Sequence, residues 1–171
     1  MLMLQTDRLL LRPVQREDMD VYRQILSCPQ LTRFLPKGKP YTESEISQHV
    51  VNRVDHWRRH EFGSFVILDN TDAQRKLGYV GVEESPQPGC FDIRYALVRD
   101  ALGLGLALEA AQSVVQFIFS HNKLKRIYGV SLVDNQPSLA VLRKLAMKPA
   151  RNVDLYGDRS LITLVLEQPE R

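Results

Sequence analysis

Cysteine is scarce in this sequence, which has only Cys28 and Cys90 among its 171 residues. Two cysteines provide neither a disulfide framework nor the ligand spacing of a zinc site. His56 and His60 lie four residues apart, but the sequence places no third ligand near them. We therefore expect a protein of the reducing cytoplasm that uses no metal.

Long hydrophobic runs are also missing. No stretch approaches the roughly 18 apolar residues that cross a bilayer. The N-terminal residues carry no positively charged leader, and Asp7 and Arg8 interrupt their apolar positions, so we do not expect a signal peptide. The sequence predicts a soluble, cytoplasmic protein without a membrane partner.

Charge of one sign is not in large excess. Lys and Arg number 23 against 20 Asp and Glu, which gives a net charge of +3. Such an excess does not indicate nucleic acid as a partner, although a phosphate-binding enzyme could carry it. Hydrophobic residues make up 44% of the chain, and this amount predicts a single domain over residues 1–171 with a full core.

The order of predicted elements indicates a mixed α/β (α+β) fold. Between residues 64 and 98 we expect three strands that form an antiparallel meander, with a polar turn over 69–76. The segment 30–41 reads as irregular, and Thr42 with Glu45 forms a capping box that opens a helix. The other predicted elements are strands over 8–14 and 125–133, helices over 16–28, 42–59, 106–122 and 135–146, and a closing hairpin around 156–158.

Two glycines, Gly103 and Gly105, stand where the third meander strand gives way to a helix. A helix N-terminus presents unpaired N–H groups, and glycine lets a phosphate approach the backbone closely. A tight corner alone would also explain an isolated G-x-G. The dinucleotide fingerprint G-x-G-x-x-G fails, since Leu108 occupies the place of the third glycine, and no Gly-Lys-Ser/Thr follows for a P-loop.

The stretch YALVRDALGLGLALEAA (95–111) resembles the acyl-CoA signature of the GNAT N-acetyltransferases, Gln/Arg-x-x-Gly-x-Gly/Ala. Its positions here are Leu102, Gly105 and Ala107. The segments RLLLRP, LTRFLP, GYVGV and VDNQPSLAVLRKLAM resemble, in this order, the branch that acetylates protein N-termini, including ribosomal-protein-alanine acetyltransferases. The resemblance extends over roughly residues 4 to 167.

This resemblance implies a GNAT-like fold, in which a central, mostly antiparallel and splayed sheet is flanked by helices. It also implies acetyl-CoA as co-substrate, with pantetheine paired to the strand end near Leu97 and Val98. The N–H groups of residues 103–107 would hold the pyrophosphate. The implied cofactor-binding residues are Leu97, Val98, Leu102, Gly103, Leu104, Gly105, Leu106, Ala107, Asn135 and Ser138.

The sequence departs from the family pattern at the phosphate loop. Leu102 stands where the family usually has Gln, Arg or an aromatic residue, and Leu104 often corresponds to Lys or Arg. A loop with leucines at 102, 104 and 106 lacks the charge-assisted contact that a cation would give. Arg99 lies close in sequence and could compensate. The departure motivates an alternative function, a catalytically weakened module of the same fold that binds acyl-CoA or a protein.

Asn135 and Ser138 open a predicted helix. Asn is a favoured N-cap, and capping alone would explain the pattern. The family resemblance implies more: Asn135 would hydrogen-bond near the pantetheine, and Ser138 would protonate the departing sulfur. Because a free thiol has a pKa of about 8.5, a weak proton donor suffices.

The base that takes the amine proton is left open among carboxylates. Glu83 and Glu84 face opposite sides of a strand, so at most one of them faces the cleft. Asp92 on the next strand and Asp154 before the last turn are the other candidates. Each of these residues could equally be a solvated charge at a strand end. The catalytic candidates carried forward are Ser138, Glu84, Asp92 and Asp154.

Together these features predict an N-acetyltransferase that moves acetyl from acetyl-CoA to a primary amine. The acceptor is a protein N-terminus or a small-molecule amine. A nucleotide-dependent enzyme that uses the same glycine turn is a further alternative, against which the incomplete fingerprint argues. If the chain self-associates, a two-fold homodimer is the expected arrangement.

Overall fold

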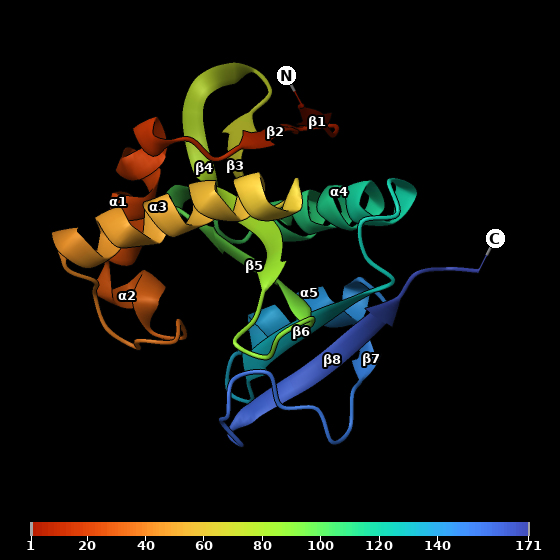
Figure 1. Ribbon diagram of the computed structural model, residues 1–171. Helices are drawn as coiled ribbons and strands as arrows, with labels where there is room; N and C mark the ends of the chain where they lie inside the picture. The colour runs from red at the N-terminus through yellow and green to blue at the C-terminus, as the bar shows by residue number, and fades with distance from the viewer. Residues whose placement is uncertain (1, 171) are drawn as a thin grey trace.

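The computed structural model describes residues 2–170; Met1 and Arg171 of the predicted domain lie outside the described residues. Its strands form one open sheet in the order β1-β2-β3-β4-β5-β6-β8-β7 (Figure 1). All neighbouring strands pair antiparallel except β5 and β6. The strands are β1 (Leu4–Gln5), β2 (Leu9–Pro13), β3 (Ser64–Asp69), β4 (Asp72–Glu84), β5 (Phe91–Leu97), β6 (Arg126–Leu132), β7 (Lys148–Pro149) and β8 (Leu161–Glu167).

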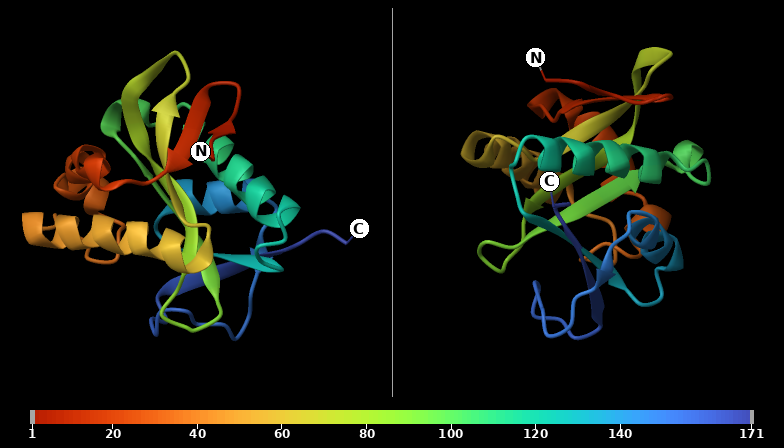
Figure 2. Two further views of the ribbon diagram at one scale, coloured as in Figure 1. Left: turned by 45° about the horizontal axis from the view of Figure 1, so that its top comes forward. Right: turned by 90° about the vertical axis from the view of Figure 1, so that its right-hand side faces the viewer.

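Helices cover both faces of this sheet. Figure 2 shows α1 and α3 on one side of the central strands and α4 on the other. The α-helices are α1 (Met19–Leu26), α2 (Pro29–Thr32), α3 (Glu43–His60), α4 (Leu106–Ser120) and α5 (Gln136–Lys144), and two 3-10 turns span Arg16–Asp18 and Arg99–Ala101. The buried hydrophobic residues between the layers form one cluster that extends from Leu9 to Leu164. The predicted mixed α/β fold with a splayed, mostly antiparallel sheet is confirmed.

The predicted meander is confirmed, since β3, β4 and β5 pair antiparallel in sequence order. The predicted polar turn over 69–76 is wrong in extent. Asp69 pairs with Asp72, so the turn consists of Asn70 and Thr71, and β4 begins at Asp72. Residues 72–75 are exposed. Their polar side chains belong to a hairpin end that projects beyond the core, and this is why they read as a turn.

Two predicted helical boundaries also differ. The helix expected over 16–28 begins as a 3-10 turn, because the buried Asp18 accepts a hydrogen bond from the Gln15 backbone N–H at 2.7 Å and ion-pairs with Arg12. The segment 30–41, expected to be irregular, overlaps the one-turn helix α2, which Pro29 opens at its first position. The capping box of α3 is confirmed, since the Thr42 side chain and Glu45 exchange hydrogen bonds with each other's backbone N–H groups.

The C-terminal part forms a looser hairpin than predicted. β7 has only two residues, and a loop of residues 150–160 separates it from β8. The short N-terminal strand β1 was not predicted at all. No helix in the described part of the chain is long and apolar enough to cross a membrane.

The feature that positions the site is the divergence of β5 and β6. These parallel strands pair only at Asp92 with Tyr128 and at Ile93 with Gly129. Beyond Ile93 the strands separate, which opens the middle of the sheet. A side chain at Gly129 would collide with Leu142 of α5 at 2.7 Å, so glycine lets α5 pack directly on β6 beside this opening.

Candidate active site

A cavity of about 470 Å³ lies where β5 and β6 diverge. Residues of β5, β6 and α5 form one part of its wall. The loop 34–36, α3, β4 and the segment 156–161 contribute most of the other lining residues. The cavity therefore joins segments that are far apart in sequence, and it contains Ser138, Asn135 and Asp92 of the residues selected from the sequence.

One wall of the cavity carries a pair of hydroxyl groups. The Tyr95 hydroxyl lies 3.0 Å from Ser138 Oγ. Burial raises the pKa of Tyr95, so this phenol stays protonated at neutral pH. Asn135 accepts a hydrogen bond from the Ser138 backbone N–H and caps α5, as its residue type predicts. Sequence reasoning did not identify the Tyr95 hydroxyl as part of the site.

The opposite part of the wall holds a buried carboxylate between two arginines. Glu83 Oε1 lies 2.8 Å from Arg53 Nε and accepts a hydrogen bond from Ser64 Oγ at 3.0 Å, while Arg94 Nη1 lies 3.9 Å away. Glu83 is 1% exposed. Burial raises the pKa of Glu83 despite the nearby Arg53 and Arg94 charges. Within the described residues, Glu83 Oε2 has no hydrogen-bond partner.

Asp92 lies in the same cavity and is held by two neighbours. Its Oδ2 accepts a hydrogen bond from the Tyr156 hydroxyl at 2.6 Å, and Oδ1 accepts one from Arg94 at 3.1 Å. Burial, together with the Asp92 charge, raises the pKa of Tyr156 above its usual range. Sequence reasoning saw Tyr156 only as part of a turn, since nothing in the local pattern shows that the loop 150–160 reaches β5.

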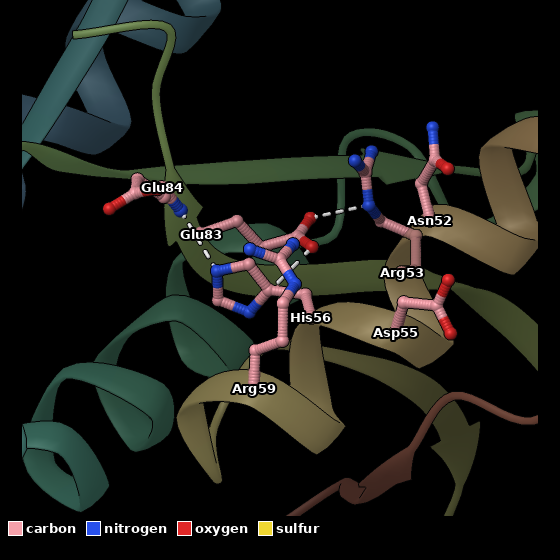
Figure 3. A pocket seen from close by; sticks show the side chains of 7 residues that line it. All are labelled: Asn52, Arg53, Asp55, His56, Arg59, Glu83 and Glu84. Carbon is pink, nitrogen blue, oxygen red and sulfur yellow. Dashed lines mark hydrogen bonds and ion pairs between the residues drawn. The ribbon is translucent and has the colours of Figure 1, made fainter. Parts of the chain in front are cut away.

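Glu84 points away from this cavity. Glu84 lines a second, smaller hollow of about 270 Å³. Figure 3 shows it with His56 and Arg59, which also line this hollow. The Glu84 carboxylate accepts a hydrogen bond from the Gly89 backbone N–H at 3.4 Å. Arg53 and Glu83 line both cavities, so their ion pair stands between the two. The structure thus places Glu83, and not its neighbour Glu84, in the large cavity.

His56 is engaged at both ring nitrogens. Nε2 accepts a hydrogen bond from the Glu84 backbone N–H, and Nδ1 donates to the Phe62 carbonyl, each at 2.9 Å. Burial lowers the pKa of His56 to about 4. Among residues 2–170, no group of three or more His, Cys, Asp or Glu side chains is arranged to hold a metal ion.

Asp154 does not line the large cavity. Its Oδ1 accepts hydrogen bonds from the backbone N–H groups of Tyr156, Gly157 and Asp158 at 3.1, 2.8 and 3.2 Å. This arrangement is a side-chain cap of the turn that carries Tyr156. The Asp154 carboxylate therefore stabilises this turn.

The turn before α4 has the geometry of an anion cradle. Gly103 and Gly105 have φ values of +75° and +77°, in the left-handed region that favours glycine. Gly105 is the N-cap of α4, and no side chain caps this helix. The first N–H groups of α4 therefore have no intrahelical acceptor and no capping side chain. In the described part of the chain, no atom beyond the adjacent residues lies within 4 Å of the position that a Gly103 Cβ would occupy.

The leucines of this turn differ in their surroundings. Leu102 and Leu104 are 49% and 56% exposed, whereas Leu106 is buried and Ala107 is half-buried at the start of α4. Arg99, the cation suggested by the sequence, donates a hydrogen bond to the Gln30 side chain at 3.0 Å. An anion at this turn would be held by backbone N–H groups, which do not depend on the leucine side chains.

The end of β5 leaves one set of backbone groups facing the opening of the sheet. Val98 donates its N–H to the Leu77 carbonyl at 2.9 Å, toward β4. Successive residues of a strand direct their backbone groups to opposite sides, so those of Leu97 point away from β4. Of the two residues selected for the pantetheine, Leu97 is thus available and the N–H of Val98 is used within the sheet.

Comparison with known proteins defines the class. Residues 8–148 match the sequence model of the acetyltransferase (GNAT) domain. The chain belongs to this family, and it is an acyltransferase that uses acetyl-CoA.

Individual relatives are distant. The chain is 26% identical over 149 residues to the N-acetyltransferase p20 of Bacillus licheniformis, a match that covers 85% of this chain and 82% of p20. Its fold is similar to the crystal structure of an acetyltransferase from Agrobacterium tumefaciens, with a TM-score of 0.88, 21% identity, and coverage of 98% and 95% of the two chains.

A second similar structure is the Salmonella typhimurium acetyltransferase that modifies the N-terminal serine of ribosomal protein L7/L12. Its TM-score is 0.78, with 17% identity over 97% of this chain and 99% of that one. These two structural likenesses establish the fold.

Proposed function

We propose that this protein transfers acetyl from acetyl-CoA to a primary amine, and that a protein N-terminus is the acceptor. The observation that carries the proposal is the cavity between β5 and β6. It has the Tyr95–Ser138 hydroxyl pair in one part of its wall and the buried carboxylate of Glu83 in another. A proton donor and a proton acceptor thus face one enclosed space.

The co-substrate would enter this space from the glycine turn. Backbone N–H groups of residues 103–107 would hold the diphosphate, and the backbone of Leu97 would pair with the pantetheine. Asn135 lines the cavity beside Ser138 and would lie close to the pantetheine end. The acetyl thioester would then lie in the cavity beside the hydroxyl pair.

The chemistry is a direct transfer. The neutral amine forms a bond to the thioester carbonyl carbon, and the carbon–sulfur bond breaks. Ser138 gives its hydroxyl proton to the leaving sulfur and takes the Tyr95 hydroxyl proton in the same step, so the negative charge ends on the phenolate, which regains a proton from solvent as Glu83 releases its own. Glu83 takes the proton that the amine loses. Holding the amine and the carbonyl in contact contributes much of the acceleration.

Glu83 suits the role of base better than the other carboxylates. Its raised pKa increases its basicity, and Oε2, which lies 4.0 Å from His56 Nδ1, has no hydrogen-bond partner among the described residues. Asp92 also lies in the cavity, but Tyr156 and Arg94 hold both of its oxygens. We assign Asp92 the task of orienting Arg94 and Tyr156.

A protein N-terminus is favoured for two reasons. An α-amine has an ordinary pKa near 8, so a modest base suffices, whereas a lysine amine near 10.4 demands more. One protein of similar fold modifies the N-terminal serine of ribosomal protein L7/L12. Phe34, Leu35 and Pro36 also line the cavity, and their loop would contact the first residues of a peptide.

The test is acetylation of a peptide panel with varied first residues, with small primary amines and an internal-lysine peptide for comparison. Mass spectrometry reports a gain of one acetyl group. We expect transfer to at least one N-terminal amine and faster turnover than on lysine. Acetylation of small amines alone would contradict the protein-acceptor proposal, and absence of transfer to any amine would contradict the enzyme assignment.

The adjacent glutamates provide a matched pair of variants. Glu83→Gln should lower kcat by about 100-fold, a typical contribution of a general base, whereas Glu84→Gln should retain kcat within about twofold. Equal effects at Glu83 and Glu84 would contradict the assignment of the base.

Ser138→Ala should lower kcat about tenfold, because a thiolate is already a good leaving group.

The exposed leucines favour a second candidate function. Leu102 and Leu104 place no charged side chain at the phosphate turn, so the chain could be a weakened module that binds acyl-CoA or a protein. Binding of acetyl-CoA without turnover on any amine of the panel would favour this candidate. Turnover on any amine would exclude it.

A further inference from the structure

A cation does reach the glycine turn, and it comes from the N-terminal hairpin between β1 and β2. Arg8 Nη1 donates a hydrogen bond to the Leu104 carbonyl at 2.9 Å, and Arg8 Nε donates one to Glu109 Oε1 at 2.7 Å. Arg8 Nη2 lies 3.6 Å from the point where a side chain at Gly105 would begin. The guanidinium therefore packs against the turn, although 96 residues separate Arg8 from Leu104.

The bond to Leu104 fixes the orientation of one peptide group. In a trans peptide the C=O and the following N–H point in opposite directions. By holding the Leu104 carbonyl, Arg8 directs the Gly105 N–H to the other face of the turn, away from the hairpin. A turn with two glycines has many accessible conformations, so an anchor of this kind reduces the entropy lost when a ligand binds.

Arg8 also offsets a charge that opposes phosphate binding. Glu109 lies in the first turn of α4, and a carboxylate there competes with a phosphate for the positive end of the helix. Glu109 accepts hydrogen bonds from the Thr6 hydroxyl and from the backbone N–H and Nε of Arg8. Burial would raise the pKa of Glu109, but these hydrogen bonds outweigh it and the pKa is lowered, so the group is charged at neutral pH.

We infer that Arg8 is a positioning residue for acetyl-CoA. It orients the Leu104–Gly105 peptide for the diphosphate and neutralises Glu109 beside it. The inference rests on the proposed cofactor site at residues 103–107. It explains how a loop with exposed leucines at 102 and 104 could retain affinity for a ligand with several negative charges. The hairpin thus supplies the cation that offsets Glu109, which the loop sequence alone does not reveal.

The experiment measures acetyl-CoA affinity by titration calorimetry, without an acceptor, for four variants. Arg8→Gln should weaken binding about tenfold, because a loop hydrogen bond and a compensating charge are both lost. Arg8→Gln combined with Glu109→Gln should recover part of that loss, since the uncompensated carboxylate is gone. Arg8→Lys, which keeps the charge without the planar fork, should fall between the wild type and Arg8→Gln. Arg99→Gln, the matched control beside the same loop, should change affinity less than twofold.

A phosphate-free donor, S-acetylpantetheine, separates positioning of the diphosphate from a general structural effect. We expect Arg8→Gln to bind this donor as the wild type does. Unchanged acetyl-CoA affinity in Arg8→Gln, or equal losses for both donors, would overturn the inference. If Arg8→Gln fails to fold, the acetyl-CoA affinity of Arg8→Lys is compared with that of Arg99→Gln. Weaker binding by Arg8→Lys would support the inference, and equal affinities would overturn it. Failure of the wild type to bind acetyl-CoA would instead overturn the proposed cofactor site.

Discussion

At the scale of single residues, His56 connects three segments of the chain. Its ring nitrogens join α3 to the Phe62 carbonyl and to the Glu84 backbone N–H at the end of β4. Both contacts require the neutral ring with the proton on Nδ1. Protonation of Nε2 would place a donor opposite the Glu84 N–H, which is also a donor.

This arrangement predicts a pH-dependent stability. The folded-state pKa of His56 is lowered to about 4, chiefly by burial, against 6.5 for the free side chain. The unfolded chain therefore binds the proton more tightly. The stabilisation is complete above pH 6.5 and is lost as the pH falls toward 4. We expect a loss of about 3 kcal/mol across this window, since one pKa unit corresponds to about 1.4 kcal/mol.

Urea unfolding at a series of pH values measures this effect. His56→Gln should be less stable at pH 7 and should show a shallower decline below pH 6.5. The half-buried His49, whose pKa desolvation lowers to about 3, adds a slope of the same sign that remains in this variant. An equal slope in wild type and His56→Gln would contradict the account.

Residue types at the site were only partly predictable. Ser138 and Asn135 were found because the family resemblance implies their roles and a helix start places them. Tyr95 and Tyr156 were missed, because their hydroxyl partners come from α5 and β5, which are distant in sequence. The choice between Glu83 and Glu84 could not be made from strand alternation alone, since that pattern shows only that the two face opposite ways.

At the scale of elements, the glycine turn predicts a change in affinity that is separable from backbone strain. Gly105→Ala places a side chain at φ of +77°, which should cost about 1 kcal/mol of stability. The new methyl group would also lie 3.6 Å from Arg8 Nη2. We therefore expect acetyl-CoA affinity to fall at least about fivefold as the turn relaxes away from its left-handed conformation.

Gly89 provides the matched control for this variant. It has φ of +81° and no atom within 4 Å of an added side chain, in the turn that leads into β5. Gly89→Ala should lose similar stability in thermal unfolding while keeping acetyl-CoA affinity. If Gly89→Ala weakens binding as much as Gly105→Ala, the effect would reflect general destabilisation and would not locate the cofactor.

Most elements could be predicted from the sequence because their hydrophobic periodicity and caps are local. The capping box at Thr42 and the three meander strands are examples. The errors lie where tertiary contacts override a local pattern. The hairpin end of β3 and β4 is polar because it projects into solvent. The short strand β1 exists because it pairs with β2, through Leu4 and Leu11, and its own sequence carries little strand signal.

At the scale of the whole molecule, the site depends on a sheet that separates at its centre. Only two residue pairs join β5 to β6, although each strand has seven residues. Strand periodicity does not report which strands pair or where pairing stops, so the splay was expected only from the family resemblance. The same holds for the contact between the N-terminal hairpin and the turn before α4.

The central claim is that the glycine turn and the opening between β5 and β6 form one acetyl-CoA site. Thermal unfolding with and without millimolar acetyl-CoA, with CoA and NAD for comparison, tests it most directly. A ligand at 100 times its dissociation constant adds about 2.7 kcal/mol, which corresponds to a rise of roughly 5–10 °C for a chain of this size. We predict this rise with acetyl-CoA and CoA, and none with NAD. No rise with either CoA species, or an equal rise with NAD, would contradict the account.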